Sequence, residues 1–231
     1  MITSADNQKI KDIIKLNNKK YRMSEKRFVV EGSHLVDEAR KCGVLIEAYS
    51  INELPQYIQI SEALMKKICK TDTVVTEIGI CKMLDNTNIS NKLLLLDRVQ
   101  DPGNIGALMR SAKAFGFDTI VLGDGCCDIY NDKAIRSSQG AIFKLNFINA
   151  NLLEFIPKLN GYDIYGTNVV NGIELDKVNK TNKIALVLGN EGSGISQELD
   201  RILSKNIYIP MNSTESLNVS VAGSIIMYFL R

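Results

Sequence analysis

Apolar runs of strand length alternate with helical stretches through the second part of the chain. The strand-like runs lie at residues 93–96, 119–122, 163–169, 184–188 and 207–211, and apolar residues at helical spacing fall at 104–115, 152–159, 195–203 and 217–230. Alternation of strands with helices is typical of βαβ units, in which the strands run parallel. The pattern therefore predicts an α/β domain with a mainly parallel sheet and helices on both of its faces.

The first part of the chain has shorter and less regular elements. We expect helices at 4–16, 33–41 and 61–70 and strands at 28–30 and 44–50. Ser4 is the expected N-cap of the first helix. Residues 71–90, which contain Gly79, show no clear periodicity, and we place a domain boundary there, near residue 88. The chain thus divides into a small α/β domain, residues 1–88, and a larger one, residues 89–231.

Polar segments follow three of the strand-like runs of the larger domain. They are DPGNIGALMRSA at 101–112, LGNEGSGIS at 188–196 and the loop that opens IPMNSTESLNVSVAGSIIMYFLR at 209–231. Each segment alone reads as an ordinary turn or helix start. Together they carry side chains beyond what a turn needs, namely Asn104, Arg110, Asn190, Glu191, Ser216 and Asn218. Ligands of open α/β sheets bind at the carboxyl ends of strands, so these segments predict a binding site.

Several kinds of site are excluded or disfavoured. The phosphate-loop motif GxxxxGK[ST] and the dinucleotide motif GxGxxG are both absent. The single histidine, His34, lies in the other predicted domain, which nearly excludes a Ser-His-Asp triad. With one histidine and no CxxC spacing, a metal site is improbable. The remaining ligand class is a neutral or cationic nucleotide-like molecule that backbone groups hold.

Charge is informative in its distribution, since the net charge is only +2. Residues 9–27 carry eight basic groups against Asp12 and Glu25, and Tyr21 lies among them. Such a patch suits a phosphate backbone, with one ring able to stack on a base. A solvated helix face followed by a loop explains it equally well. No apolar run is long enough to span a membrane, and five cysteines without a framework indicate a reducing cytoplasm.

The three polar segments resemble the three motifs of the SpoU (TrmH-like) RNA 2′-O-ribose methyltransferases of the SPOUT superfamily. The first motif, N-x-G-x-x-x-R, matches Asn104 to Arg110; the second, N-E-G-x-G, matches 190–194. The third matches Ile209-Pro210-Met211 and S-L-N-V-S-V-A at 216–222, although the segment 211–214 lacks the glycine that often follows and is one residue shorter. Residues 7–39 resemble the small L30e-like substrate-binding domain of the rRNA-modifying members.

The resemblance implies a catalytic domain with a C-terminal trefoil knot whose loops bind S-adenosyl-L-methionine without a metal. By matching position, Gly189, Ile209 and Leu217 would contact this cofactor through backbone atoms. The family assigns Arg110 to activation of the ribose hydroxyl, as a proton acceptor or as a clamp for phosphate and ribose. Asn104, Glu191, Ser216 and Asn218 would orient Arg110, the loops and the ribose.

The resemblance further implies a cytoplasmic enzyme that methylates ribose in RNA, with large-subunit ribosomal RNA as the expected substrate. Lys19, Lys20, Arg22 and Arg136 are the expected RNA contacts, with Lys133 and Ser138 beside Arg136. A homodimer is expected because family members build the active site at a dimer interface and because 219–230 is apolar nearly all round. Two alternatives stay open: a tRNA ribose methyltransferase of the same family, and a non-catalytic RNA-binding or ribosome assembly factor.

Overall fold

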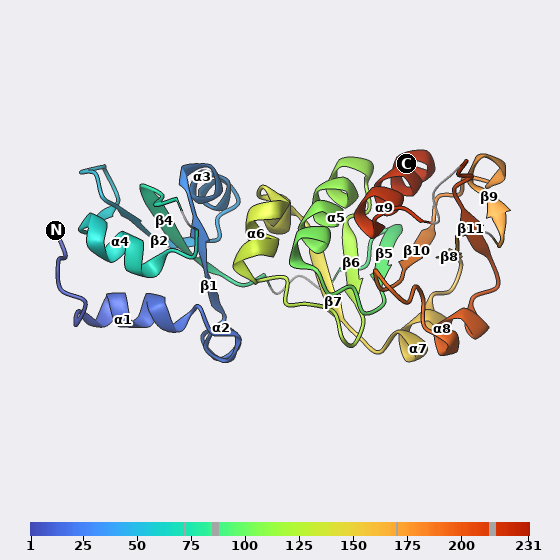
Figure 1. Ribbon diagram of the computed structural model, residues 1–231, viewed down its shortest axis with the longest axis horizontal. Coiled ribbons are helices and arrows are strands. Elements are labelled where there is room, and N and C mark those ends of the chain that lie inside the picture. Colours follow the sequence, from blue (N-terminus) through green and yellow to red (C-terminus); the bar gives the residue numbers. More distant parts are fainter. Residues whose placement is uncertain (72, 85–87, 170, 213–215) are drawn as a thin grey trace. The chain divides into compact units, whose positions relative to one another are not determined.

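A computed structural model describes residues 1–71, 73–84, 88–169, 171–212 and 216–231 (Figure 1). The chain forms two compact units, one made of Met1–Asp85 and Asp128–Phe143, the other of Asn86–Cys127 and Lys144–Arg231. The segment 128–143 thus belongs to the first unit, which the sequence pattern did not suggest. Residues 213 and 214 of the shortened third motif lie outside the described residues.

The first unit is built on a four-stranded sheet of order β1-β4-β2-β3. Its elements are α1 (Gln8–Lys15), α2 (Lys19–Glu25), β1 (Arg27–Glu31), α3 (Ser33–Lys41), β2 (Leu45–Ser50), β3 (Ile58–Gln59), α4 (Glu62–Ile68), β4 (Glu77–Lys82) and α6 (Asp132–Ser138). Ile10 and Ile13 of α1 and Leu64 and Met65 of α4 pack into one buried cluster with the sheet. This cluster fixes α1, which carries part of the basic segment.

The first unit differs from the sequence analysis in three places. The N-cap of α1 is Asn7, whose side-chain oxygen accepts from the Lys9 amide at 3.0 Å, not Ser4. Residues 19–25 form helix α2, a helix that the sequence analysis did not predict. The weak region 71–90 contains β4, which pairs with both β1 and β2. Gly79 interrupts the apolar run of β4, so the sequence pattern did not indicate a strand. The glycine fits the packing, because a Cβ there would lie 2.7 Å from a Leu45 methyl group.

The second unit holds a seven-stranded sheet of order β7-β6-β5-β10-β8-β11-β9, in which every described pairing is parallel. Its elements are β5 (Lys92–Leu96), α5 (Pro102–Phe115), β6 (Thr119–Leu122), β7 (Asn146–Asn149), α7 (Leu152–Phe155), β8 (Asp163–Thr167), β9 (Ile173–Glu174), β10 (Ile184–Leu188), α8 (Gln197–Ile202), β11 (Asn206–Tyr208) and α9 (Val219–Leu230). The expected α/β class with a mainly parallel sheet is confirmed. The trefoil knot stays an implication of the resemblance.

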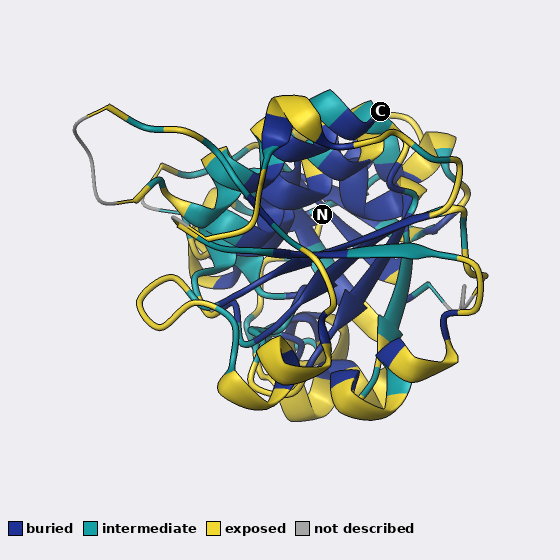
Figure 2. Cartoon of the chain, turned by 90° about the vertical axis from the view of Figure 1, so that its right-hand side faces the viewer, coloured by how far each residue is buried: buried dark blue, intermediate teal, exposed yellow. Residues whose placement is uncertain are grey.

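Helices cover both faces of this sheet. Helices α5 and α9 pack together on one face, and α7 and α8 lie on the other (Figure 1). The central strand β10 is buried along its whole length, and Figure 2 shows the buried strands in dark blue between helices whose outward surfaces are yellow. Gly223 of α9 permits the close approach of α9 to the sheet, because a Cβ there would lie 2.6 Å from Leu188 and 2.7 Å from Leu108. The packing holds the start of α9 beside the strand ends.

Candidate functional site

The second-motif loop, residues 189–196, leaves the carboxyl end of β10 and folds back on itself. The backbone groups of Asn190 and Gly194 exchange hydrogen bonds of 2.9 and 3.0 Å. The side-chain oxygen of Asn190 accepts from the amides of Gly192 and Ser193, at 3.0 and 3.1 Å. Gly189 begins the loop where a Cβ would lie 2.1 Å from the Gly194 carbonyl carbon, so only glycine fits. The loop is therefore a compact, internally bonded turn.

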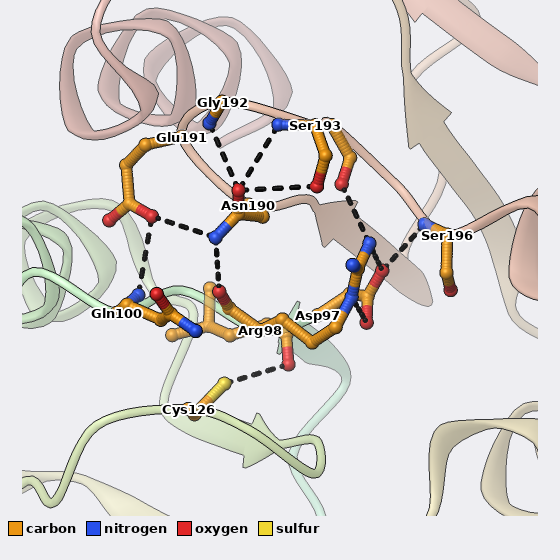
Figure 3. A network of polar contacts seen from close by, with 11 residues as sticks. Asp97, Arg98, Gln100, Cys126, Asn190, Glu191, Gly192, Ser193 and Ser196 are labelled. Carbon is orange, nitrogen blue, oxygen red and sulfur yellow. Dashed lines mark hydrogen bonds and ion pairs between the residues drawn. The ribbon is translucent and has the colours of Figure 1, made fainter.

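Asp97 and Arg98, at the end of the neighbouring strand β5, hold this turn in place (Figure 3). The Asp97 carboxylate accepts from the Ser196 amide at 2.7 Å and from the Arg98 guanidinium at 3.2 Å. Arg98 also donates to the Gly194 carbonyl at 3.2 Å, and its own carbonyl accepts from the Asn190 side chain at 2.9 Å. Sequence reasoning missed both residues. The available signal was an acid directly after the apolar run 93–96, and Asp97 is only 5% exposed.

The Glu191 carboxylate joins the second-motif loop to the first motif. It accepts four hydrogen bonds, from the amides of Gln100 and Asp101 at 3.2 and 3.0 Å and from the side chains of Asn104 and Asn190 at 3.1 and 3.3 Å. Burial raises the pKa of the Glu191 carboxyl, but the bonds from Asn104 and the backbone outweigh it and hold the pKa below its ordinary value. A carboxylate so engaged is a poor proton acceptor, and its geometry assigns it to positioning.

Asn104 and Asn218 extend this network to the start of α9. The Asn218 amide donates to the Asn104 side-chain oxygen at 3.0 Å. The Asn218 oxygen caps α9 by accepting from the Ser220 amide at 2.9 Å, and the Asp101 carboxylate caps α5 by accepting from the Asn104 amide at 2.9 Å. The starts of both helices and the second-motif loop thus form one hydrogen-bonded assembly. Three of the expected site residues, Asn104, Glu191 and Asn218, are direct partners in it.

A cavity of about 360 Å³ opens beside this assembly, at the carboxyl ends of β8, β10 and β11. Its lining includes Gly189, Ile209 and Leu217, the three expected cofactor contacts, together with Glu191 and Ser216. The volume lies in the usual range for a bound small molecule, roughly 300–1,000 Å³. Among the described residues of the lining, Glu191 alone is charged, and its carboxylate accepts from the four donors described above. The cavity therefore suits a ligand held by backbone groups and apolar side chains.

S-Adenosylmethionine meets these conditions. Backbone groups at strand ends and in the turn at Gly189 can bond an adenine edge and the polar amino-acid end of the cofactor. Apolar side chains such as Leu188, Ile207 and Ile226 supply surface for the rings. The described part of the lining contains no cluster of cations for phosphate, which agrees with the absence of phosphate-binding motifs.

Arg110 lies outside the lining of this cavity. It is exposed on α5, and its guanidinium makes no hydrogen bond or ion pair with any residue within the described ranges. The next residue, Ser111, bonds to Ser224 of α9 at 2.6 Å. Arg110 is therefore an uncommitted cation near the paired helices α5 and α9, available to a ligand or a second molecule.

The expected RNA contacts divide into two groups. Lys19 and Lys20 are exposed at the start of α2. Arg22 is not available to RNA: its side chain is 9% exposed, and it donates to Asp128 at 2.6 Å and to the carbonyls of Leu16 and Asn17 at 2.9 Å each. The expectation for Arg22 is withdrawn for this reason, since the residue ties α1 and α2 to the segment that begins at Asp128.

The other group lies on α6, in the first unit. Arg136 is about one-third exposed and pairs with Asp132 at 2.8 Å, so it keeps one face toward solvent. Ser138 is fully buried and donates to the Ile135 carbonyl at 2.7 Å, which removes it from the expected contacts. Lys133 is exposed, and its backbone amide donates to the side chain of the N-cap Asn131 at 2.9 Å.

Across the described part of the chain, no cluster of three or more histidine, cysteine or acidic residues could hold a metal ion. Within the same residues, no helix is long and apolar enough to cross a membrane.

Known proteins resemble this chain along its whole length. A relative, the 23S rRNA (guanosine(2553)-2′-O)-methyltransferase RlmP of Bacillus subtilis, is 37% identical over 244 residues, which cover 100% of this chain and 98% of RlmP. The crystal structure of an rRNA methyltransferase from Sinorhizobium meliloti superimposes with a TM-score of 0.88 at 26% identity, covering 100% of this chain and 96% of that one, and an AdoMet-bound form matches equally. AviRb of Streptomyces viridochromogenes, with AdoMet, shares the fold with a TM-score of 0.86 at 22% identity and 97% coverage of both chains.

Two family models match the two parts of the chain. The model of the MRM3-like substrate binding domain matches residues 7–76, and the model of the SpoU rRNA Methylase family matches residues 91–228. The second match spans the three motif segments and the cavity, which the second and third of them line. This chain therefore belongs to the SpoU rRNA methylase family.

Proposed function

We propose that this protein transfers a methyl group from S-adenosylmethionine to a ribose 2′-hydroxyl of large-subunit ribosomal RNA. The observation that carries the proposal is the cavity at the ends of β10 and β11, which Glu191 and Asn104 connect to the helix that bears Arg110. The 37% identity to RlmP, which extends over the full length of this chain, supports ribosomal RNA as the substrate. The match of 7–76 to a substrate-binding domain supports it further.

When bound, the sulfonium would supply an electrophilic methyl carbon whose bond to sulfur breaks as its bond to the ribose 2′-oxygen forms, which releases S-adenosylhomocysteine and the hydroxyl proton. Gly189, Ile209 and Leu217 hold the cofactor side of the site. Asp97, Arg98 and Glu191 hold the first-motif and second-motif loops in fixed positions through their hydrogen bonds. A fixed geometry of this kind replaces the entropy of bringing two reactants together.

Arg110 acts on the ribose side of the site. A guanidinium stays protonated in proteins, so a role as hydrogen-bond donor and clamp fits it better than a role as base. Its exposure and its lack of a described partner leave all its donors for a phosphate or a ribose oxygen. A phosphate held there is placed to take the hydroxyl proton. Ser216, at the cavity rim, can orient the ribose.

Mapping of ribose methylation tests the function directly. In cells that lack the protein, one 2′-O-methylated nucleotide of 23S rRNA is expected to lose its modification, and the purified protein with cofactor should restore it. The position in the name of RlmP, guanosine 2553, is the first to test. Methylation of transfer RNA alone would favour the tRNA alternative. Absence of methyl transfer to any cellular RNA would favour a non-catalytic assembly factor.

We also propose that the protein works as a homodimer through α9, in the cytoplasm where ribosomes are made. Val221, Ile225 and Tyr228 lie on one side of α9 and are 47%, 40% and 54% exposed. The Tyr228 ring packs edge-on against Phe115 of α5, with centroids 5.5 Å apart, so the apolar surface extends over both helices. A second copy would cover this surface and lie beside Arg110.

The reaction is expected to persist in EDTA, provided that the RNA stays folded.

Replacement of Glu191 by alanine is expected to weaken cofactor binding by about tenfold, because it removes four hydrogen bonds that hold the second-motif loop to the first motif, each worth roughly 0.5–1.5 kcal/mol. Glu191→Gln should lose less, since one acceptor oxygen remains. Titration calorimetry with S-adenosylmethionine measures both. Glu154→Ala, an exposed acid on α7, is the control and should bind like the parent.

The same carboxylate predicts a pH dependence. The folded state lowers the pKa of Glu191 from its ordinary value of 4.5, so its contribution to stability is present above that value and is lost as pH falls through the lower folded pKa. Cofactor affinity of the parent should therefore be insensitive to Glu191 between pH 6 and 8. A cofactor affinity of the parent that changes with pH with a midpoint near neutrality, together with the loss of this pH dependence in Glu191→Gln, would contradict the assigned role.

Charge reversal of Lys19 and Lys20 is expected to weaken RNA binding and to flatten its dependence on salt. Each phosphate contact that is lost lowers the slope of log K against log salt by roughly 0.7–0.9. Lys66 and Lys67, two consecutive exposed lysines on α4, are the matched control pair. Binding curves at several salt concentrations measure this slope for each variant. Equal slopes for the Lys19/Lys20 and Lys66/Lys67 double variants would show that the α2 lysines are a solvated surface without a role in RNA binding.

A further inference from the structure

A second hollow, about 210 Å³ in volume, is lined by residues of the first unit alone. Helices α1 and α2 and the strands β1 and β4 contribute its lining. Its size is below the roughly 300–1,000 Å³ of a site for a drug-sized ligand, so it admits a group of about one ring system.

The hollow has an apolar floor and an aromatic wall. Leu16 and Ile80 line it and are only 5% and 7% exposed, so they belong to the buried core of the unit. Tyr21 of α2 also lines it but is 42% exposed, an unusual position for a ring in a segment with so many cations. A flat, apolar group inserted there would contact both the floor and the tyrosine ring.

Charged groups of both signs stand around this floor. Asp12 and Lys15 pair with each other at 3.0 Å. Glu25 and Arg27 also line the hollow, and neither side chain makes a hydrogen bond or ion pair with another described residue. The hollow thus offers one uncommitted acceptor and one uncommitted donor beside a ring.

This combination discriminates among ligands. A phosphate alone would meet no excess of positive charge, because Asp12 and Glu25 balance Lys15 and Arg27 in the lining. A purely apolar side chain would leave both uncommitted charges unused. A nucleobase has a flat face for stacking and an edge with donors and acceptors. An exocyclic amine donates to a carboxylate, and the neighbouring ring acceptor receives from arginine.

We propose that this hollow binds one unpaired, amine-bearing base of the RNA substrate, stacked on Tyr21 with its edge between Glu25 and Arg27. The inference rests on the proposed function for the identity of the RNA, and on the first unit alone for the site. Lys19 and Lys20, at the start of the same helix, are placed to hold the flanking phosphates. The first unit thereby reads a base as well as the backbone.

Binding of short ribo-oligonucleotides to the full chain tests the subsite. Fluorescence anisotropy with labelled oligocytidylate should show that Tyr21→Ala lowers affinity about 5- to 150-fold, which corresponds to roughly 1–3 kcal/mol for one stacked base. Tyr21→Phe keeps the ring and should stay within about twofold of the parent. The matched control is Met23→Ala, on the same helix and 43% exposed but outside the hollow, and it should bind like the parent.

The salt dependence separates stacking from phosphate contact. Stacking releases no counterions, so the slope of log K against log salt should be the same in Tyr21→Ala and the parent, whereas the lysine reversals change it. An affinity of Tyr21→Ala within twofold of the parent, or a changed slope, would overturn the proposal.

Base preference provides a second, independent measurement that does not depend on the folding of Tyr21→Ala. The parent should prefer oligocytidylate to oligouridylate by about fivefold or more, because uracil presents an oxygen where cytosine has an amine. Replacement of the exposed Glu25 by glutamine should reduce that preference, since the amide can accept from the cytosine amine and can also donate to the uracil oxygen. Equal affinity of the parent for the two oligonucleotides would contradict the assigned edge contacts.

The outcomes also separate this subsite from the proposed function. If the parent methylates 23S rRNA while Tyr21→Ala binds oligonucleotides like the parent, only the subsite is wrong. If no RNA is methylated but Tyr21→Ala loses oligonucleotide affinity, the subsite stands and the catalytic proposal fails.

Discussion

Replacement of Arg110 by alanine should lower single-turnover methylation by about 10²–10⁴-fold, the range that one positioned proton-transfer or clamping group contributes. Cofactor affinity should stay within about threefold of the parent, because Arg110 lies outside the lining of the cofactor cavity. Removal of a residue that acts on the ribose slows the chemical step and leaves cofactor binding largely unchanged. Single-turnover kinetics on 23S rRNA, together with calorimetry for the cofactor, measure the two quantities separately.

Arg110→Lys distinguishes charge from geometry. Lysine keeps the positive charge but loses the planar fork, so a clamp predicts a severe loss there too. Lys113→Ala, an exposed cation one turn further along α5, serves as the control and should keep parental turnover. Near-parental turnover of Arg110→Ala would remove Arg110 from the reaction. Glu191 would not replace it as the base, since its carboxylate already accepts four hydrogen bonds, and an RNA phosphate would then be the leading candidate.

Introduction of aspartate at Ile225 is expected to convert a dimer to monomers and to abolish methylation. Ile225 lies in the middle of the exposed apolar stripe of α9, and a twofold interface would bury the new charge twice. An uncompensated buried charge costs roughly 3–5 kcal/mol, so the dissociation constant should rise at least about 10²–10³-fold. Light scattering coupled to size-exclusion chromatography at micromolar concentration gives the mass.

The matched control is Ile202→Asp, on α8 at the other face of the sheet, where the parent isoleucine is 43% exposed. It should leave both mass and activity unchanged. Thermal unfolding of both variants separates loss of assembly from loss of fold. A parent that is monomeric at micromolar concentration, or an Ile225→Asp variant that stays dimeric, would contradict the proposed interface.

Local signals sufficed for five of the seven described strands of the second unit, whereas β7 and β9 were not predicted. The strands at 119–122 and 184–188 were predicted with the bounds that the structure has, because each is a short apolar run between polar residues. The strand β4 was missed because Gly79 interrupts its apolar run, although that glycine is required by the packing of Leu45 against it. Helix α6 was missed because its partners lie far away in the sequence, as in the 4.7 Å approach of the Tyr130 ring in the same segment to Phe28.

The site divides in the same way. Asn104, Glu191 and Asn218 could be named from motifs, but only the folded chain shows that they bond to one another in series. Asp97 and Arg98 carry no motif, and their hold on the second-motif loop is visible only across two neighbouring strands. Arg22 stood among exposed lysines in the sequence, yet it is buried against Asp128, more than a hundred residues away.

The sequence by itself determined the α/β class, the three polar loops at strand ends and the family, because short-range periodicity and motif spacing are local properties of the chain. The tertiary structure decided which charged side chains are free, which are committed to neighbours and which loops share a hydrogen-bond network. Those properties depend on contacts between residues distant in sequence, since burial and pairing are set by the elements that pack against a side chain. Arg110 and Glu191 illustrate the difference: both are charged motif residues, and only folding leaves the first uncommitted and gives the second four partners.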